Sequence, residues 1–262
     1  MPRWNAQDYS KSSSEQEKWA RELMSKLALK GNERVLDIGC GDGKVTAEMA
    51  RRLPKGSILG IDSSKEMIRF ARQRFPERRF PTLAFEEGDA RKLNFASEFD
   101  IVFSNATLHW VIDHLPVLKG IKNSLKPSGV ALLQMGGRGN AKAVGDIVNV
   151  TTSSDKWSRH FEYFVFPYGF YGPEEYHDWL KLADLRARRI ELIEKDMVLK
   201  GKEGLCAWIR TTWLYYTEQV PEELRFKFID EIAESYILDN PLDEEGMVHV
   251  QMVRLEVEAE VR

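Results

Sequence analysis

Three glycines lie within five positions near the start of the chain, in the stretch VLDIGCGDGKVTAEMA (residues 35–50). They follow an apolar run and precede a helical pattern, a junction where backbone amides converge and the helix dipole adds partial positive charge. Asp62 follows about 20 residues later, at the end of the next apolar run, where a carboxylate can accept both hydrogen bonds of a ribose diol. The pattern predicts a nucleotide-type binding site; the alternative is a turn that only packs a strand against a helix.

Candidates for acceptor chemistry stand later in the chain. His109 and Trp110 follow shortly after another apolar run, FDIVF (99–103), at the end where open α/β sheets bind ligands. Arg210 stands among the aromatic residues of WIRTTWLYY (208–216), and Arg138 follows the next apolar run. A histidine is the usual general base for a phenol or amine, whereas a carboxylate is already ionised and needs only an orienting donor such as arginine. The alternative roles are structural: His109 as a hydrogen-bonded core residue, Trp110 as a packed core residue, and the helix face around Arg210 as a surface that only packs against other helices.

The elements that would position these residues follow from hydrophobic periodicity. Strands are expected at 34–39, 57–62, 83–89, 99–105 and 129–135, with helices at 14–29, 44–53, 64–75 and 113–125. Strands that alternate with amphipathic helices predict crossover units and a parallel sheet. Beyond residue 135 the sequence predicts a strand at 186–199, helices at 201–220 and 221–238, and a half-exposed antiparallel strand at 248–261, at or near a sheet edge.

Composition excludes several classes. The chain has 262 residues, of which 43% are hydrophobic and 30% charged, and a net charge of −3. A nucleic-acid-binding surface would show a basic excess, so the basic runs at 72–80 and 185–190 are expected to be solvated faces. Cys40 and Cys206 are too few for a disulfide framework or a metal site. No signal peptide or membrane-length apolar run occurs, and a cytoplasmic protein is expected.

Five stretches in order resemble the motifs of class I S-adenosylmethionine-dependent methyltransferases. They are VLDIGCGDGKVT, GIDSSKEMIRFAR, EEGDARKL, FDIVFSNATLHWV and LKPSGVALLQM. An NAD-dependent dehydrogenase also suits the glycine turn, but the serine doublet after Asp62 fits it poorly and the chain has no Tyr-x-x-x-Lys pair. The resemblance implies S-adenosylmethionine as the cofactor.

The resemblance also implies the fold. It predicts an α/β protein with a Rossmann-like, doubly wound sheet of seven strands, mostly parallel with an antiparallel last strand, and a helical cap inserted after strand five. One domain is expected over 1–262, divided into an N-terminal lid and helix (1–30), a cofactor-binding core (31–136), a cap (137–245) and a final strand (246–262).

Cofactor contacts are carried over onto matching positions. The family implies Asp37, Gly39 and Gly41 around the methionine portion, Asp62 on the ribose, Ser63 and Met67 near the adenine, Asp89 with Ala90 at the adenine amino edge, Asn105 near the sulfonium, and Trp4 and Tyr9 in a lid. Met67 as ordinary core and Asp89 as a helix cap are the alternatives.

The likeness is closer to the trans-aconitate and juvenile hormone acid methyltransferase type, through WNAQDYS (4–10), SNATLHW (104–110) and WIRTTWLYY (208–216). It is strong over 1–136 and looser beyond. This type methylates a carboxylate of a small molecule, so an organic-acid acceptor is expected, without nucleic-acid or membrane partners, for a monomer or homodimer. His109 replaces an amide of the type. A phenolic, isoprenoid, nitrogen or carbon nucleophile with His109 as base, and a non-catalytic cofactor-binding protein, are the alternatives.

Overall fold

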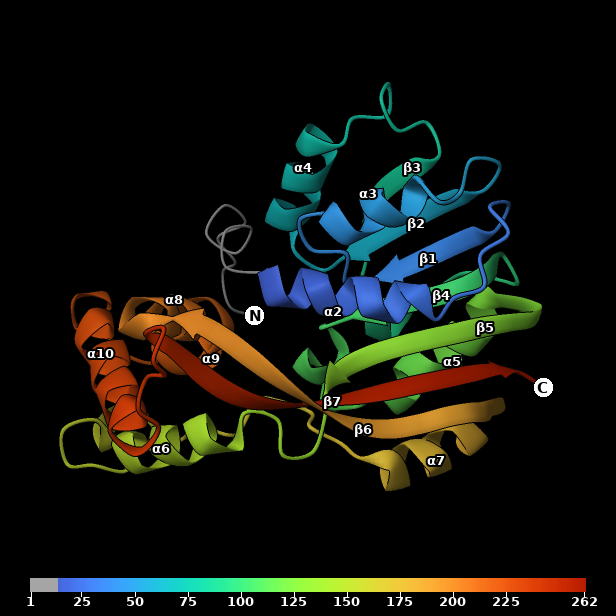
Figure 1. Cartoon of the computed structure of the whole chain (residues 1–262). Helices are drawn as coiled ribbons and strands as arrows, with labels where there is room; N and C mark the ends of the chain where they lie inside the picture. Colours follow the sequence, from blue (N-terminus) through green and yellow to red (C-terminus); the bar gives the residue numbers. More distant parts are fainter. Residues whose placement is uncertain (1–13) are drawn as a thin grey trace. The chain divides into compact units, whose positions relative to one another are not determined.

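The structure, a computed structural model, describes residues 14–262 (Figure 1). The chain forms two compact units that alternate along the sequence. The sheet unit comprises residues 14–138, 168–193 and 254–262, and the helical unit comprises residues 139–167 and 194–253 of the described chain. The predicted cofactor residues from Asp37 to Asn105 all belong to the sheet unit, whereas Arg210 belongs to the helical unit.

Seven strands form one sheet in the order β3-β2-β1-β4-β5-β7-β6. They are β1 (Arg34–Ile38), β2 (Ser57–Asp62), β3 (Leu83–Glu87), β4 (Phe99–Asn105), β5 (Leu125–Gly136), β6 (Leu185–Lys200) and β7 (Met247–Val261). Strands β1 to β5 pair in parallel, and β7 pairs antiparallel with β5. The arrows of β6 and β7 point in opposite directions in Figure 1. The predicted seven-stranded sheet with an antiparallel last strand is confirmed.

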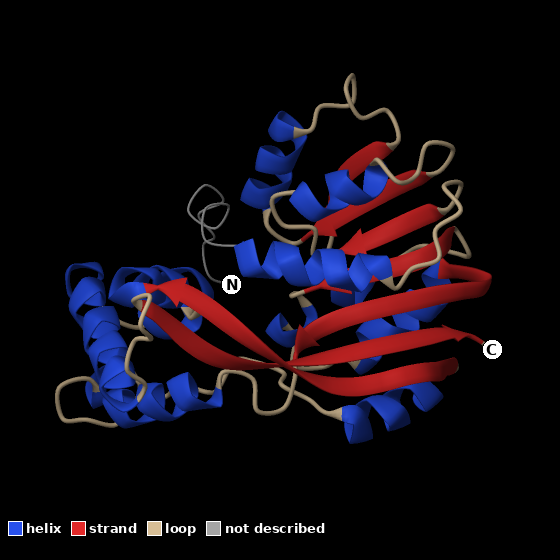
Figure 2. Cartoon of the chain, viewed as in Figure 1, coloured by secondary structure: helices blue, strands red, loops and turns tan. Residues whose placement is uncertain are grey.

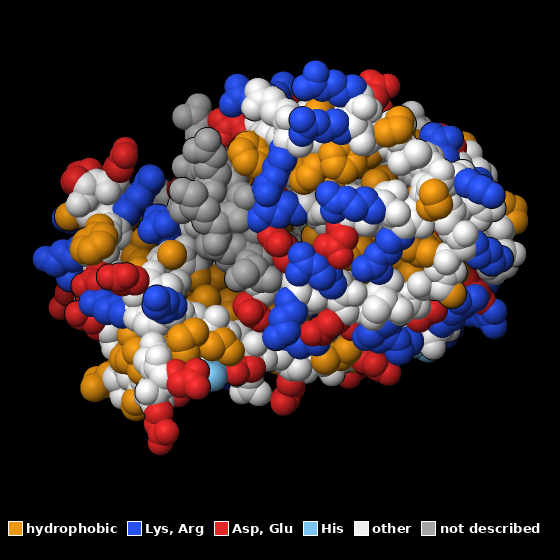
Figure 3. All heavy atoms as spheres, turned by 45° about the horizontal axis from the view of Figure 1, so that its top comes forward, with side chains coloured by type: hydrophobic (Ala, Val, Ile, Leu, Met, Phe, Trp, Pro, Cys, Tyr) orange, Lys and Arg blue, Asp and Glu red, His pale blue; other side chains and the backbone are white. Residues whose placement is uncertain are grey.

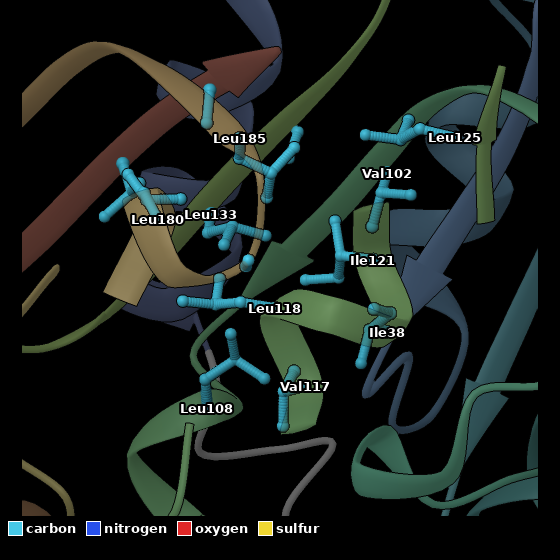
Figure 4. Close-up of a cluster of buried hydrophobic side chains, with 14 of the residues drawn as sticks. Ile38, Val102, Leu108, Val117, Leu118, Ile121, Leu125, Leu133, Leu180 and Leu185 are labelled. Carbon is cyan, nitrogen blue, oxygen red and sulfur yellow. The ribbon is translucent and has the colours of Figure 1, made fainter. Parts of the chain in front are cut away.

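Helices cover both faces of this sheet (Figure 2). The helices of the sheet unit are α2 (Ser14–Ser25), α3 (Lys44–Ala50), α4 (Lys65–Arg74), α5 (Leu115–Ser124) and α7 (Pro173–Leu182). Successive strand residues point to opposite faces, so Val35 packs with α2, α3 and α4, whereas Leu36 packs with α5 and α7. Figure 4 shows the second of these clusters, where Leu133 of β5 lies near Leu118 of α5 and Val102 of β4 lies near Ile121 of α5. Because these strands are buried on both faces of the sheet, their sequences are continuous apolar runs.

Strand β5 begins earlier than the sequence predicts. Pairing with β4 starts at Leu125, opposite Phe99, and then slips, since Ile101 faces Val130. Ser128 lies in this bulge with a φ of 65°. The sequence predicts a strand that starts only at Gly129, because Lys126, Pro127 and Ser128 precede it as a turn, and the structure shows instead that these residues are an irregular part of the strand.

Strand β7 is the clearest correction to the expected elements. It lies next to the edge strand β6, in keeping with a position near a sheet edge, but the carboxylates of Glu256 and Glu260 are buried rather than half-exposed. Lys26 and Arg189 hold Glu256 at 2.6 and 2.9 Å, and Arg188 pairs with Glu260. The basic run 185–190 therefore supplies cations to the glutamates of β7, which an alternating pattern alone does not reveal.

The helical unit has an aromatic core. It contains α6 (Lys142–Thr152), α8 (Gly201–Thr212), α9 (Leu214–Thr217), α10 (Glu222–Asp239) and the adjoining ends of β6 and β7. Trp157 and Phe228 meet edge to face with ring centroids 5.1 Å apart. The single helix expected over 201–220 is interrupted at Trp213, whose backbone leaves the helical region so that its ring packs against Tyr216 with centroids 5.5 Å apart.

Charged side chains of both signs are interspersed over the face drawn in Figure 3, in keeping with the net charge of −3. Within residues 14–262, none of the helices combines the length and the apolar character needed to cross a bilayer.

Candidate active site

The glycine turn joins β1 to α3, and its three glycines have different reasons to be glycine. Gly39, Gly41 and Gly43 all have positive φ, at 76°, 53° and 79°. A Cβ on Gly39 would lie 2.1 Å from the Thr107 side chain, and one on Gly43 would lie 2.6 Å from the Phe85 ring. A Cβ on Gly41 would meet nothing within 4 Å. Packing explains two of the glycines, and only Gly41 borders open space that a ligand could fill.

Asp62 ends β2 beside this turn. Its Oδ2 accepts the N–H of Gly41 at 3.0 Å, and its Oδ1 accepts the N–H of Ser64 at 2.8 Å. No lysine or arginine of the described chain forms an ion pair with it. Burial raises the pKa of Asp62, and the two backbone bonds oppose that rise. Each oxygen has a further lone pair, so the carboxylate can accept a pair of hydroxyl groups next to the open space at Gly41.

Asp37, in β1, lies beneath the turn. It is 2% exposed, and its Oδ2 accepts the hydroxyl of Thr46 at 2.7 Å. Burial raises the pKa of Asp37 to about 7; the Thr46 bond lowers it, and the charge of Asp62 adds to the rise. A cationic group near Asp37 would favour its ionised form, because an opposite charge offsets desolvation.

The four residues expected around the adenine lie between the end of β2 and the first residue of the short helix η1 (Ala90–Lys92). Met67 of α4 is 3% exposed, and Ser63 is exposed. Asp89 accepts the N–H of Arg91 at 2.9 Å and binds its guanidinium at 2.6 Å, which together lower the pKa of Asp89. The structure therefore shows Asp89 as the helix cap that the alternative predicts. Contacts of Asp89 and of Ala90 with an adenine stay predictions.

The end of β4 is tied to the glycine turn. Thr107 donates its hydroxyl toward the carbonyl oxygens of Gly39 and Asn105, each at 3.1 Å. Asn105 therefore lies at the junction of β1 and β4, where the strand order reverses direction and open α/β sheets bind ligands.

His109 lies just beyond this junction. Its Nδ1 accepts the N–H of Gly136, the last residue of β5, at 3.3 Å. Burial lowers the pKa of His109 well below its usual value, and the charges of Arg254 and His114 lower it further. The ring is therefore neutral, and because Nδ1 is the acceptor, Nε2 carries the proton and is a donor.

Aromatic side chains surround this imidazole. The rings of Trp110 and Phe170 lie 5.4 and 6.0 Å from it, and Tyr168 stacks on Phe170 at 5.3 Å. The N–H of Gly169 also donates to the carbonyl of His109 at 2.9 Å. The structure thus brings the segment 168–170 to His109, which no periodicity in the sequence indicates.

A buried histidine holds the turn that carries His109 and Trp110. The Nε2 of His114 lies 2.9 Å from the carbonyl oxygens of both Leu108 and Val111, and its Nδ1 lies 2.7 Å from the hydroxyl of Tyr176. Nothing in the local sequence WVIDHLP (110–116) indicates this role, which depends on Tyr176 in a distant helix.

Arg254 is the other residue that the sequence analysis missed. It pairs across the sheet with Gly136, it is 3% exposed, and its guanidinium lies 5.3 Å from the ring centroid of Trp19 in α2. One signal was available in the sequence. Positions 254, 256, 258 and 260 share one face of a strand, and Arg254 is the basic residue among three glutamates.

Other candidates are not brought to this edge by the described geometry. Arg138 is bound to Glu174 and Glu175 at 3.1 and 2.5 Å, which removes it as an anion-binding candidate. Arg210 is exposed on α8, while its neighbours Trp208 and Trp213 are buried within the helical unit. Trp4 and Tyr9 lie outside the described residues.

Known proteins resemble the chain in sequence and in fold. Residues 29–165 match the family model described as a methyltransferase domain. A trans-aconitate 2-methyltransferase of Azoarcus sp. is 36% identical over 135 residues, which cover 52% of this chain and 51% of that relative. Another trans-aconitate 2-methyltransferase, of Deinococcus radiodurans, is 30% identical over 214 residues and covers 80% of this chain and 81% of its own length.

The similarity of fold extends over nearly the whole chain. The YcgJ protein of Bacillus subtilis superposes with a TM-score of 0.62 at 17% identity, covering 94% of this chain and 99% of its own. The matched family model spans the glycine turn, Asp62 and His109 alike. The chain therefore belongs to the methyltransferase domain family, in the S-adenosylmethionine-dependent class that its motifs indicate.

Proposed function

We propose that this chain methylates a carboxylate oxygen of a small organic acid, with S-adenosylmethionine as the methyl donor. The open space at Gly41 and the acceptor oxygens of Asp62 fit the sugar of such a cofactor, and Asp37 suits its amino group. When bound, S-adenosylmethionine supplies an electrophilic methyl group on a sulfonium. The relatives named trans-aconitate 2-methyltransferases support an acid as the acceptor.

The observation that carries the choice of acceptor is the state of His109. A phenol or amine acceptor must lose a proton to a base, whereas a carboxylate is ionised at neutral pH. The lone pair that a base would use is on Nδ1, and that atom already accepts the N–H of Gly136. His109 therefore offers a hydrogen bond from Nε2, which suits a carboxylate and not a neutral hydroxyl that must be deprotonated.

The surrounding residues have roles that follow from this chemistry. The rings of Trp110 and Phe170 flank the imidazole and exclude water, which strengthens a hydrogen bond to a charged oxygen. The Gly136 amide and the His114 anchor fix the ring and the turn that carries it, so that an acceptor is held in one orientation. Arg210 remains a proposed second donor to the acceptor.

Two substitutions of one residue test the donor role. His109→Gln keeps a neutral donor near the position of Nε2 but removes any base, and His109→Leu removes both. We expect His109→Gln to keep kcat/KM within about tenfold of the wild type and His109→Leu to lose about 100-fold or more. Equal losses in both variants would instead show that His109 acts as a base.

The product and the pH profile provide the matching test of function. With methyl-labelled S-adenosylmethionine and a panel of small acids that includes trans-aconitate, we expect an alkali-labile methyl ester by mass spectrometry. The rate should stay flat from about pH 8 down to about pH 5.5, because a carboxylate stays ionised over that range. Transfer to a phenol, amine or carbon centre, with a rate that falls through the histidine range, would contradict the proposal.

The setting of the reaction is part of the same proposal. We place the protein in the cytoplasm, as a monomer or homodimer that acts on a free small acid. The proposal also includes one methyltransferase domain over residues 1–262, with a lid that contains Trp4 and Tyr9.

A further inference from the structure

The helical unit contains a cavity that the proposed function does not use. Its volume is about 540 Å³, and its lining residues all fall within 149–166 or at Tyr216 of α9. These residues belong to the helical unit, whereas the cofactor residues from Asp37 to Asn105 belong to the sheet unit. A space of this volume suits a small molecule, and the side chains around it determine which kind of molecule that is.

Aromatic rings form the walls of this cavity. They are Phe161, Phe164, Phe166 and Tyr216. The ring of Phe164 lies 4.5 Å from that of Tyr216 and meets the ring of Phe161 edge to face at 5.5 Å. The rings around the cavity are therefore inclined to one another, which favours a further flat ring in offset or edge-to-face contact with them.

The hydroxyl of Tyr216 has an unmet need for a partner. Tyr216 is 3% exposed, yet no residue from 14 to 262 forms a hydrogen bond with its hydroxyl. Buried hydroxyl groups nearly always have a hydrogen-bond partner, because leaving one unpaired costs free energy. Burial also raises the pKa of Tyr216 to about 12, so the hydroxyl keeps its proton and can donate it. A molecule in the cavity that carries an acceptor oxygen would provide the partner.

Polar side chains without charge complete the lining. The hydroxyls of Thr152 and Ser153 donate to the carbonyl oxygen of Asn149 at 3.2 and 2.8 Å, and their own oxygens keep lone pairs that can accept a hydrogen bond. The side-chain amide of Asn149 and the hydroxyl of Ser158 also line the cavity. Among the described residues, no charged side chain does so, and an ion would therefore lose its water there without gaining a counter-charge.

We infer that this cavity binds a neutral, planar compound of two fused aromatic rings that carries a carboxamide or a similar carbonyl group. The rings of the ligand lie against Phe161 and Phe164, and its carbonyl oxygen accepts the hydroxyl of Tyr216. An amide N–H of the ligand donates to the hydroxyl oxygen of Thr152 or Ser153. An organic acid is unsuited to this lining, so the cavity is a site separate from the one proposed for the methyl acceptor.

Two probes of the same shape test the preference for a neutral ligand. They are 2-naphthamide and 2-naphthoate, used with the full chain. We expect calorimetry to give a Kd for 2-naphthamide between about 10 µM and 1 mM, as is usual for a ligand of this size, and binding of 2-naphthoate to be weaker by about tenfold or more. Saturating S-adenosylhomocysteine should leave the affinity for 2-naphthamide unchanged.

Removing one hydroxyl tests the role of Tyr216. Tyr216→Phe keeps the ring, and we expect it to weaken 2-naphthamide binding about 5- to 20-fold, because one hydrogen bond to the ligand is lost. Its melting temperature should not fall, since no hydrogen bond within the described chain is broken. Ser158→Trp introduces a large ring from an exposed position of the lining and should abolish binding.

Tyr236→Phe is the matched control. Tyr236 belongs to the same unit and is 2% exposed, but its hydroxyl donates to the carbonyl oxygen of His249 at 2.8 Å. This substitution should therefore lower the melting temperature and leave the affinity for 2-naphthamide unchanged.

Three results would overturn the inference. The first is no binding of 2-naphthamide to the wild type by saturation-transfer NMR at about 1 mM, or binding no tighter than that of 2-naphthoate. The second is an unchanged affinity for 2-naphthamide in Tyr216→Phe. The third is displacement of 2-naphthamide by the acid that the protein esterifies, which would make the cavity part of the acceptor site and leave the proposed function standing.

Discussion

Two aspartates at the glycine turn show how burial and hydrogen bonding set apart residues of one type. Asp62 accepts two backbone N–H groups, whereas Asp37 accepts one hydroxyl in a fully buried position. Burial raises the pKa of both, to about 7 for Asp37. The first is arranged to accept further hydrogen bonds, and the second is arranged to attract a cation.

Replacing Asp62 tests the first arrangement. In Asp62→Asn the amide NH₂ would face either the Gly41 or the Ser64 N–H, and one charged acceptor is lost. We expect S-adenosylhomocysteine affinity to fall about 10- to 100-fold by calorimetry, since hydrogen bonds to charged groups are the stronger ones. Asp155→Asn, at an exposed position of the helical unit, is the control. Unchanged affinity in Asp62→Asn would remove Asp62 from the cofactor site.

Asp37 should make the ligand-free protein less stable as the pH rises. An unfolded aspartate ionises near pH 3.8 and Asp37 near pH 7, so its contribution is fully present below the lower value and lost on passing through the upper one. Urea unfolding at about pH 4.5 and 8 should show a wild-type loss, relative to Asp37→Asn, on the order of a few kcal/mol. Asp37→Asn keeps an acceptor for Thr46. Parallel pH profiles in the two proteins would contradict the raised pKa.

At the scale of elements, the site is built where strands end. The junction of β1 and β4 carries the glycine turn and Asn105, His109 follows β4, Gly136 ends β5, and Arg254 lies in the middle of β7. Parallel strands place their carboxyl ends at one edge of a sheet, and the antiparallel β7 brings its middle to the same edge.

The glycine turn allows packing and binding to be separated. Gly39→Ala should lower the free energy of unfolding by about 3 kcal/mol or more, because its Cβ would overlap Thr107. Gly41→Ala should cost only about 1 kcal/mol for its positive φ, yet weaken S-adenosylhomocysteine binding, because its Cβ enters the open space. Chemical denaturation and calorimetry on both variants check this. Equal stability losses, or unimpaired binding by Gly41→Ala, would contradict the division of roles.

At the scale of the whole molecule, the sheet unit is discontinuous in sequence. Three segments, 14–138, 168–193 and 254–262, build it, and β6 and β7 each continue into the helical unit. All five motifs of the methyltransferase family lie in the first segment, but that segment leaves β5 without the partner that covers its edge.

Truncation should therefore abolish folding although every motif is retained. A chain that ends at Arg138 lacks β7, so the β5 edge and the apolar residues Leu133 and Met135 become exposed. We expect no cooperative thermal transition and no S-adenosylhomocysteine binding, with the full chain as the control. A truncated chain that binds with wild-type affinity would show that residues 1–138 fold on their own.

Strand and helix types in residues 34–136 were predictable, because buried parallel strands are short apolar runs and the intervening helices show a period near 3.6. The same information placed Asp62 and His109 at strand ends. The predictions of a half-exposed β7, of one unbroken helix over 201–220 and of a β5 that starts at residue 129 were wrong. Pairing with other segments decides the first and the third, and packing of the Trp213 ring decides the second.

The sequence by itself therefore determined the order of the elements and the positions of the glycine turn and its carboxylates, since these depend on residues that are neighbours in the chain. Tertiary structure alone decided that Gly39 and Gly43 serve packing, that the Gly136 amide fixes the proton of His109, and that Arg254 lies buried opposite it. Those outcomes depend on contacts between groups that are far apart in the chain, such as Gly136 and Arg254, and that only the closing of the sheet brings together.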